Sequence, residues 1–464
     1  MVDPFLPVAE QRELIRMRVI TVRELVTAYL DRSEASQDEL NAYTLIDRHQ
    51  ALLRAELIDR RLFGGEPAGP LTGVTVGLKD LIDQKGLPTT AGSSFYRHVP
   101  NRSATVVERL EAAGAVIIGR TGLHEFAFGF SSENHWFGPV RNPWDPETSP
   151  GGSSGGSAVA VAAGLSAIAI GTDTGGSVRV PAALCGVVGL KVTHGRVSLA
   201  GVFPLAPSLD TVGPLTRTVG DAALAYQAIA GHDPADPHSV VEPVTAPDPE
   251  AGVTGLRVGV PHPWVDQPVD PALRAAFAAA VGRLAALGAE IRHLEDPFVQ
   301  PPGRITEAAY SEVAMVHGKW FPSRADEYGP EVADRLGPAM AVTVAAGVEA
   351  RRWREQLREH TFDLFRDCDV LITPAVAAMH KRIGVDELVV DGVSMGYRQA
   401  LSAFSALVNH AGHPALVVPL REEGDPPPAI QLIGPDWSEH RLLEIGRALE
   451  LAGVVGFRPP ARPQ

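Results

Sequence analysis

The sequence predicts an α/β fold in which one large sheet is covered by helices on both faces. Two observations predict it. Short segments bounded by glycine alternate with segments of helical period, and the short ones are apolar at nearly every position. Strands of that kind are buried on both sides, as in a sheet between two helical layers. The 464 residues are 45% hydrophobic and 21% charged, which is a globular composition that excludes disordered, collagen-like and coiled-coil chains.

The N-terminal part of the chain, residues 1–65, is predicted to be helical. Thr21 and Glu24 form a Thr-x-x-Glu capping box, which is typical of a helix start. Apolar Leu25, Val26 and Leu30 follow at helical spacing, so one side of this helix is expected to face the core.

The later elements follow from the same two patterns. In chain order, the predicted strands are Gly73–Leu78, Ala115–Ile118, Ser166–Ile170, Leu256–Val260, Glu290–Leu294, Val370–Thr373, Ala415–Pro419 and Ile430–Ile433. The predicted helices are Thr105–Ala113, Ser157–Ala163, Pro271–Leu287 and one that begins near Glu439. Residues 232–254 are rich in proline and aspartate. Because the alternation continues on both sides of them, they are predicted to be a surface loop within one domain.

Charge and cysteine content limit the class of protein. The chain has 41 Lys and Arg residues against 55 Asp and Glu residues, a net charge of −14, so no nucleic-acid partner is expected. The two cysteines, Cys185 and Cys368, cannot build a disulfide framework, which suits a reducing cytoplasm. There is no basic leader and no apolar run of about 20 residues, so we expect a cytoplasmic monomer or homodimer without membrane contact.

Two glycine-serine segments carry the strongest functional signal: Pro150–Ser157 (PGGSSGGS) and Gly171–Ser177 (GTDTGGS). Neither is followed by the lysine of a phosphate-binding loop, and neither has dinucleotide-binding spacing. Gly152–Gly156 does match the G-x-S-x-G nucleophile elbow, which makes Ser154 of an α/β-hydrolase a remote alternative. Asp173–Gly175 lacks the second D-T-G or D-S-G of an aspartic protease. His124-Glu125 lacks the closing histidine of H-E-x-x-H, so no metal site is expected.

A serine nucleophile with a lysine base fits these segments better. Ser177 follows Ser153 by 24 residues, and a helix and a strand fit between them, so both glycine turns can return to one end of the sheet. Lys79 ends an earlier predicted strand. A lysine without access to water loses its proton more easily, and a neutral amine can activate a serine in place of histidine.

The chain resembles the amidase signature family over nearly its whole length, and most strongly from Leu71 to Asp221. The resemblance is carried by the segments GLKDLIDQKGLPTTAGS, FGPVRNPWDPETSPGGSSGGSAVAVAAGL and GTDTGGSVRVPAALCGVVGLKVTHGRVS. It implies a single α/β/α domain over residues 1–464 with a large mixed sheet. Within that domain, residues 66–225 would be the signature core with the catalytic residues, and residues 255–464 a variable substrate-binding half that completes the sheet.

The resemblance also implies a Ser-Ser-Lys triad and no cofactor. Ser177 would be the nucleophile, Ser153 the bridging serine after a cis Gly152–Ser153 peptide bond, and Lys79 the base. The backbone N–H groups of Thr174, Gly175, Gly176 and Ser177 would form the oxyanion hole. Around the triad, Ser154 and Thr172 are expected to join its hydrogen bonds, and Asp173 and Arg179 to brace the nucleophile loop. Lys191 is a rival base that the family pattern makes structural, and Val192 stands where the family usually has proline.

The substrate is predicted from fewer residues. Phe128, Gly129 and Phe130 precede the signature loop where the family lines the acyl side of its site, and an aromatic wall favours hydrophobic or aryl amides. They could equally be core residues. We therefore expect a stand-alone amidase for a small amide, with esters, anilides or carbamates as further substrates. The alternative is the glutaminase subunit of a tRNA-dependent amidotransferase, whose glutamine-anchoring residues we could not match in residues 330–430.

Overall fold

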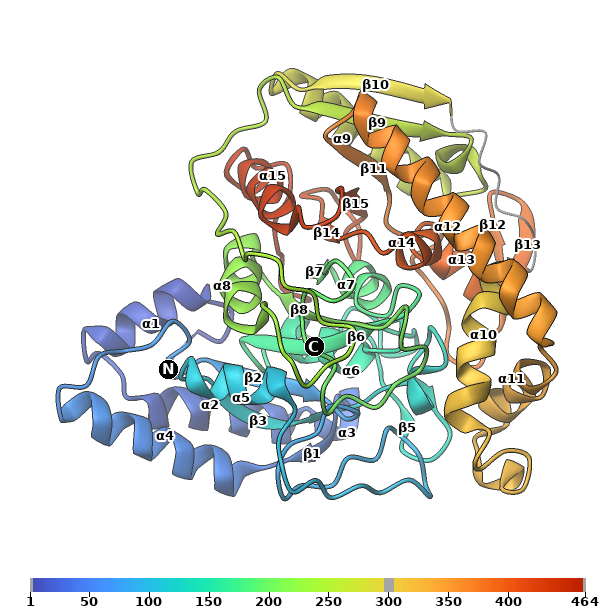
Figure 1. Cartoon of the computed structure of the whole chain (residues 1–464). Coiled ribbons are helices and arrows are strands. Elements are labelled where there is room, and N and C mark those ends of the chain that lie inside the picture. Colours follow the sequence, from blue (N-terminus) through green and yellow to red (C-terminus); the bar gives the residue numbers. More distant parts are fainter. Residues whose placement is uncertain (1–2, 296–303, 462–464) are drawn as a thin grey trace.

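A mixed sheet of eleven strands runs through the part of the chain that the computed structural model describes, residues 3–295 and 304–461 (Figure 1). The order across the sheet is β1-β3-β2-β6-β8-β7-β14-β15-β11-β9-β10. In that order the strands are Tyr43–Ile46, Val116–Thr121, Thr75–Lys79, Ile168–Asp173, Thr211–Thr216, Val188–Lys191, Ala415–Pro419, Ala429–Ile433, Val370–Pro374, Arg257–His262 and Glu290–Glu295. Two small hairpins lie outside it: β4 (Glu133–Asn134) with β5 (Gly138–Pro139), and β12 (Glu387–Val390) with β13 (Val393–Gly396).

Helices cover both faces of this sheet, so the predicted α/β class is confirmed (Figure 1). Helices α6 and α7 pack on each other and on the central strands, and α8 and α15 form a second packed pair. The α-helices are α1 Val8–Arg16, α2 Val22–Ala35, α3 Gln37–Leu40, α4 Arg48–Phe63, α5 Thr105–Ala112, α6 Gly155–Ala162, α7 Arg179–Cys185, α8 Val219–Ile229, α9 Pro271–Ala286, α10 Arg304–His317, α11 Pro330–Met340, α12 Val344–Asp367, α13 Tyr397–Ser402, α14 Ala406–Ala411 and α15 Glu439–Leu451. Short 3-10 turns are η1 Glu125–Ala127, η2 Trp264–Asp266 and η3 Ala325–Glu327.

The two halves of the chain share the sheet through one strand pair. Strand β7 pairs antiparallel with β14, with Lys191 opposite Ala415. Parallel pairs flank this junction on either side, β2 with β3 and β6 in the first half and β9 with β10 and β11 in the second. The active-site strands β2 and β6 are therefore neighbours, and both end on the same side of the sheet.

Several local features that the sequence predicts occur at the predicted positions. The hydroxyl of Thr21 accepts from the backbone N–H of Glu24 at 3.1 Å, and the Glu24 carboxylate accepts from the Thr21 N–H at 2.8 Å, so the capping box starts α2. Gly114 follows α5 with φ of +96°, a conformation that glycine adopts without strain. Residues 232–254 form the predicted loop between α8 and β9.

The prediction that residues 1–65 are helical is wrong at Tyr43–Ile46, because this short segment pairs antiparallel with β3 as strand β1. Helices α7, α8, α13 and α14 and the two hairpins were not predicted. Helices α10–α12 and strands β7 and β8 were not predicted either. The two strands carry Gly189, Gly213 and Pro214, which weaken a strand pattern, and a Cβ on Gly213 would collide with the carbonyl of Leu190 on the paired strand. The three helices lie along one side of the molecule, drawn in gold and orange (Figure 1). Residues 296–303, which belong to the predicted variable half, and the chain ends 1–2 and 462–464 lie outside the described residues.

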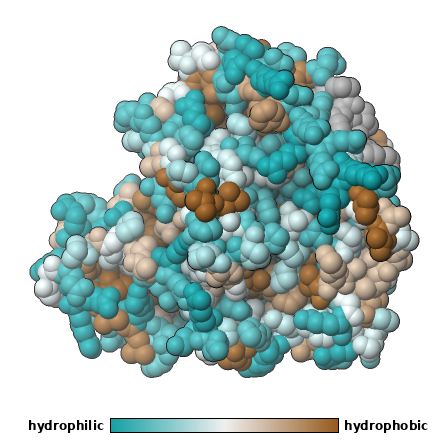
Figure 2. Space-filling model, in the orientation of Figure 1, coloured by the Kyte–Doolittle hydropathy of each residue, from teal (hydrophilic) through white to brown (hydrophobic). Residues whose placement is uncertain are grey.

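The surface agrees with a chain that is charged outside and apolar inside. The face in Figure 2 is mainly hydrophilic, with small, separate apolar patches. In the described part of the chain, no helix is long and apolar enough to cross a bilayer.

Candidate active site

Lys79 is the last residue of β2 and lies fully inside the protein. Its Nζ donates to three hydroxyl oxygens: Ser153 Oγ at 2.7 Å, and Ser154 Oγ and Thr172 Oγ1 at 2.8 Å each. Burial lowers the pKa of Lys79 to about 7, although the charges of Asp173 and Asp210 oppose this. At neutral pH this amine therefore exists in both protonation states, so it can accept a proton from a hydroxyl that it contacts.

Ser153 is fully buried in a loop whose backbone is closely packed. The Gly152–Ser153 peptide bond is cis, as the resemblance implies. The Ser153 carbonyl accepts from the His124 N–H and from the Ser132 hydroxyl, both at 3.2 Å. A Cβ on Gly152 would lie 2.7 Å from the backbone nitrogen of Ser131, so only glycine fits there. The loop that contains Ser131 and Ser132 thus holds Ser153 against Lys79.

Ser177 lies in the turn between β6 and α7 and is almost fully buried. Its carbonyl accepts from the N–H of Ser154 at 3.2 Å. The structure therefore brings the two glycine-serine segments together beside Lys79, as the sequence predicts.

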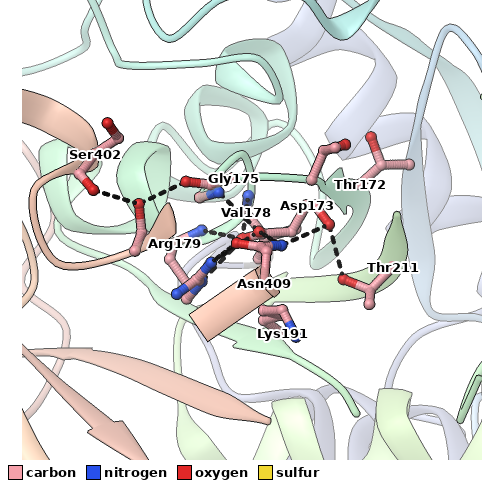
Figure 3. A network of polar contacts seen from close by, with 12 residues as sticks. Thr172, Asp173, Gly175, Val178, Arg179, Lys191, Thr211, Ser402 and Asn409 are labelled. Carbon is pink, nitrogen blue, oxygen red and sulfur yellow. Dashed lines mark hydrogen bonds and ion pairs between the residues drawn. The ribbon is translucent and has the colours of Figure 1, made fainter. Parts of the chain in front are cut away.

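The Asp173 carboxylate fixes the turn that contains Ser177 (Figure 3). It accepts from the N–H groups of Gly176 at 2.8 Å and Val178 at 3.0 Å, and from Arg179 Nη2 at 2.9 Å. Asn409 from α14 adds a further bond at 2.8 Å. Burial alone would raise the pKa of Asp173, but the charge and hydrogen bonds of Arg179 hold that pKa well below its usual range. Asp173 and Arg179 thus form the expected brace.

This geometry corrects one part of the predicted oxyanion hole. The N–H of Gly176 donates to Asp173, so it is not available to a substrate oxygen. The N–H groups of Thr174, Gly175 and Ser177 donate to no acceptor among residues 3–295 and 304–461. The turn leaves these three groups, and not four, for a ligand.

The predicted pocket wall is divided between surface and core. Phe130 is partly exposed, and its Cζ lies 3.3 Å from the position of a Cβ on Gly175. Phe128 is 5% exposed and packs edge-on against Tyr310 at 5.4 Å between centroids. Gly129 lies directly on the His124 imidazole. Phe130 therefore borders the nucleophile loop, whereas Phe128 is a buried residue that packs against Tyr310.

The alternative interpretations do not have the required contacts. The Ser154 hydroxyl bonds with Lys79 Nζ and with the Thr172 carbonyl at 3.1 Å, and no histidine in the described part of the chain contacts it, as a nucleophile elbow would require. The Nζ of Lys191 donates to the carbonyls of His413 at 2.7 Å and Val192 at 3.0 Å, which is a structural role. No cluster of three metal-binding side chains occurs within the described ranges.

Several residues at this site had no local sequence signal. Asp210 accepts from the Thr174 hydroxyl at 2.5 Å, and the Ser405 hydroxyl donates to the Gly175 carbonyl at 2.7 Å. Arg335, Arg398 and Asn409 also come from the second half of the chain.

The chain is similar to known proteins over almost its full length. The model of the family described as "Amidase" matches residues 24–443. A glutamyl-tRNA(Gln) amidotransferase subunit of Geobacter sp. (strain M21) is 38% identical over 96% of each chain. A 1-carboxybiuret hydrolase subunit of Pseudomonas sp. (strain ADP) is 37% identical over 94% of this chain and 96% of its own. A solved structure from a vestigial protein complex, described as revealing the origins of an s-triazine catabolic enzyme, has a TM-score of 0.92 and 36% identity, and covers 98% of this chain and all of its own.

Proposed function

Since the chain belongs to the amidase family and is an enzyme that hydrolyses amide C–N bonds, we propose that it does so through an acyl-enzyme formed on Ser177. The observation that carries this proposal is the 2.7 Å contact between Lys79 Nζ and Ser153 Oγ beside the Ser177 turn. This contact places a buried amine, which can be neutral near pH 7, against Ser153. The loops that contain Ser153 and Ser177 also touch each other, because the Ser154 N–H donates to the Ser177 carbonyl.

Proton transfer runs along the three residues of the triad. Neutral Lys79 takes the proton of Ser153, and Ser153 takes the proton of Ser177 as its Oγ attacks the amide carbonyl carbon. The oxyanion faces the free N–H groups of Thr174, Gly175 and Ser177. When the C–N bond breaks, the proton returns through Ser153 to the leaving nitrogen, which departs as an amine or ammonia. Water then enters by the same route and releases the acid from Ser177.

The hydroxyls of Ser154 and Thr172 have a positioning role in this scheme. A protonated Lys79 has three N–H bonds, and the three hydroxyls around it provide one acceptor for each. The ammonium form that exists between the two proton transfers is thus fully hydrogen-bonded without a carboxylate in contact. A carboxylate there would raise the pKa of the lysine and remove the base.

We further propose that the chain acts as the amide-hydrolysing subunit of a larger assembly. Two of the proteins reported above are named as subunits, and the solved structure comes from a complex. These relatives support a glutaminase subunit better than the stand-alone enzyme that the sequence favoured. Hydrolysis of carbamates has no support from any relative named above.

The second candidate is a small-amide hydrolase that is not part of a tRNA-dependent complex. It is favoured by the 1-carboxybiuret hydrolase subunit, whose identity of 37% is close to the 38% of the amidotransferase subunit. The two candidates predict different requirements for ammonia release and different partner chains.

Affinity purification from the native organism, followed by an ammonia-release assay, separates these candidates. A tRNA-dependent glutaminase is expected to co-purify with partner chains and to release more ammonia from L-glutamine when tRNA and ATP are added. A small-amide hydrolase is expected to be unaffected by tRNA and ATP. An absence of amide hydrolysis under every condition would contradict the proposed function.

A further inference from the structure

The peptide between Gly175 and Gly176 lies in the middle of the proposed oxyanion hole. The N–H groups of Gly175 and Ser177, which have no acceptor in the described part of the chain, belong to the peptides on either side of it. The orientation of the middle peptide therefore sets the direction of both donors. Glycine places few steric limits on a backbone, and Gly176 has a φ of +134° that other residues rarely adopt. Hydrogen bonds must therefore fix this peptide.

Both ends of this peptide are hydrogen-bonded, one from each half of the chain. The Gly176 N–H donates to the Asp173 carboxylate at 2.8 Å. The Gly175 carbonyl accepts at 2.7 Å from the hydroxyl of Ser405, which is fully buried between α13 and α14. A Cβ on Gly176 would collide with the same serine side chain, so the two segments are in direct contact. In Figure 3, Asp173 and Ser402, three residues before Ser405, lie on opposite sides of Gly175.

Side chains from η2 and β15 hold the segment that carries Ser405. The carbonyl of Ala403 accepts from the indole N–H of Trp264 at 3.1 Å. The carbonyl of Phe404 accepts from Gln431 Nε2 at 2.6 Å. The backbone immediately before Ser405 is therefore fixed, and its hydroxyl is directed by that fixed backbone.

Gln431 also connects this segment to the brace of the nucleophile turn. Its Oε1 accepts from Arg179 Nη1 at 2.7 Å, and Arg179 pairs with Asp173 at 2.9 Å. The network thus reaches the Gly176 N–H through Asp173 and returns to the Gly175 carbonyl through Ser405. All four of these side chains are fully buried. A buried polar network that is satisfied in this way is rigid, so it holds the enclosed peptide in one orientation.

We propose that Ser405 is a positioning residue for the reaction, because its hydroxyl fixes the peptide on which the oxyanion hole depends. Among the described residues, this hydroxyl contacts only the carbonyls of Gly175 and Ser402. Its effect on catalysis therefore passes through the turn and not through the substrate. The inference rests on the proposed acyl-enzyme reaction at Ser177. It gives the second half of the chain a part in stabilising the transition state, besides any part in binding the substrate.

Two matched serine variants test this inference. Ser405→Ala removes the hydroxyl that contacts the turn. Ser402→Ala, one turn earlier, removes a hydroxyl that donates to the Arg398 carbonyl at 2.7 Å, and serves as the control. Ser405→Cys keeps a side chain of similar shape with a weak donor, and is expected to behave between Ser405→Ala and the wild type.

The reaction with a fluorophosphonate is measured on the protein with any chains that co-purify. Its phosphoryl oxygen lies where the oxyanion would form, and the rate constant of the chemical step is obtained separately from the binding constant. Ser405→Ala is expected to lower the rate constant by about 5- to 100-fold, between the loss of one ordinary hydrogen bond and the loss of one oxyanion-hole donor. The binding constant and the pH dependence should stay as in Ser402→Ala, because Ser405 does not contact Lys79.

Amide hydrogen exchange shows whether the effect passes through the turn. The peptide that contains residues 173–178 is expected to exchange faster in Ser405→Ala than in Ser402→Ala. If the two variants react and exchange alike, or if only the binding constant changes, this inference is wrong and the proposed function stands. If the wild type forms no adduct on Ser177, the proposed nucleophile is wrong, and this inference fails with it.

Discussion

The Nζ of Lys79 donates to the Oγ of Ser153 at 2.7 Å inside a fully buried cluster of hydroxyls. Asp173 and Asp210 influence this lysine electrostatically, but no carboxylate in the described residues forms an ion pair with it. The chain places a titratable cation where burial, and not a counter-ion, decides its protonation state. This relationship supports the proposed role of Lys79 as a base.

The first prediction concerns pH. Burial lowers the pKa of Lys79 to about 7, so the neutral form that accepts a proton predominates above that pH and is lost below it. We expect kcat/KM to rise with pH through about 7 and to level off about one pH unit above the pKa, and to be about 100-fold lower at pH 5 than on the plateau. A steady-state pH profile measures this. The same profile is expected for Lys191→Met, and a rate that is independent of pH between 5 and 8 would contradict the assignment.

The second prediction separates charge from basicity at position 79. Arginine keeps a positive charge but cannot give up its proton in a protein. Lys79→Arg and Lys79→Met are therefore both expected to lower kcat by about 100-fold or more, since general-base catalysis contributes about that much. Steady-state ammonia release measures the loss. Substantial activity in the arginine variant would show that position 79 supplies only charge.

The third prediction concerns the brace of the nucleophile turn. Asp173 and Arg179 are both fully buried, and removing one partner leaves the other charge without compensation. Asp173→Asn is expected to lower the free energy of unfolding by about 3–5 kcal/mol in urea denaturation. Asp369→Asn removes a half-exposed pair with Arg257 and should have a much smaller effect. Equal losses in the two variants would mean that the Asp173 network adds nothing beyond a surface ion pair.

The fourth prediction compares two neighbouring glycines. Gly176 has φ of +134°, and a Cβ there would collide with the Ser405 side chain. Gly175 has no positive φ, and its Cβ would meet only the Phe130 ring at 3.3 Å. Gly176→Ala is expected to cost about 1–3 kcal/mol of unfolding free energy from backbone strain alone, and more than Gly175→Ala. Paired urea denaturation curves measure the difference. The reverse order of stability would contradict this description of the turn.

The fold was predictable where each strand is locally apolar. Strand β14 occupies Ala415–Pro419, as predicted, because five apolar residues form a buried strand with proline at its end. Strand β8 was missed because it contains Gly213 and Pro214, which are unusual in strands. Its antiparallel pairing stabilises the strand, and a local sequence pattern does not show that pairing. Helices α10–α12 were missed because no helical periodicity was assigned to residues 304–367 of the sequence.

The site was predictable only as far as its motifs extend. Ser153, Ser177 and Lys79 lie in segments with recognisable spacing, and the structure brings them together. Asn409 reaches Asp173 from 236 residues away, and Arg398 reaches Phe130 from the variable half. Such contacts depend on how the second half docks, which no local pattern encodes. The Gly176 N–H was assigned wrongly because sequence cannot show that the Asp173 carboxylate already occupies it.

The proposed mechanism depends most directly on which serine is the nucleophile. The measurement is labelling of the protein with a fluorophosphonate, followed by mass spectrometry of the peptides that contain Ser153, Ser154 and Ser177. We predict one adduct on Ser177, and no labelling in the Ser177→Ala variant, whereas Ser154→Ala should still be labelled. An adduct on Ser154, or labelling that persists in Ser177→Ala, would contradict the mechanism.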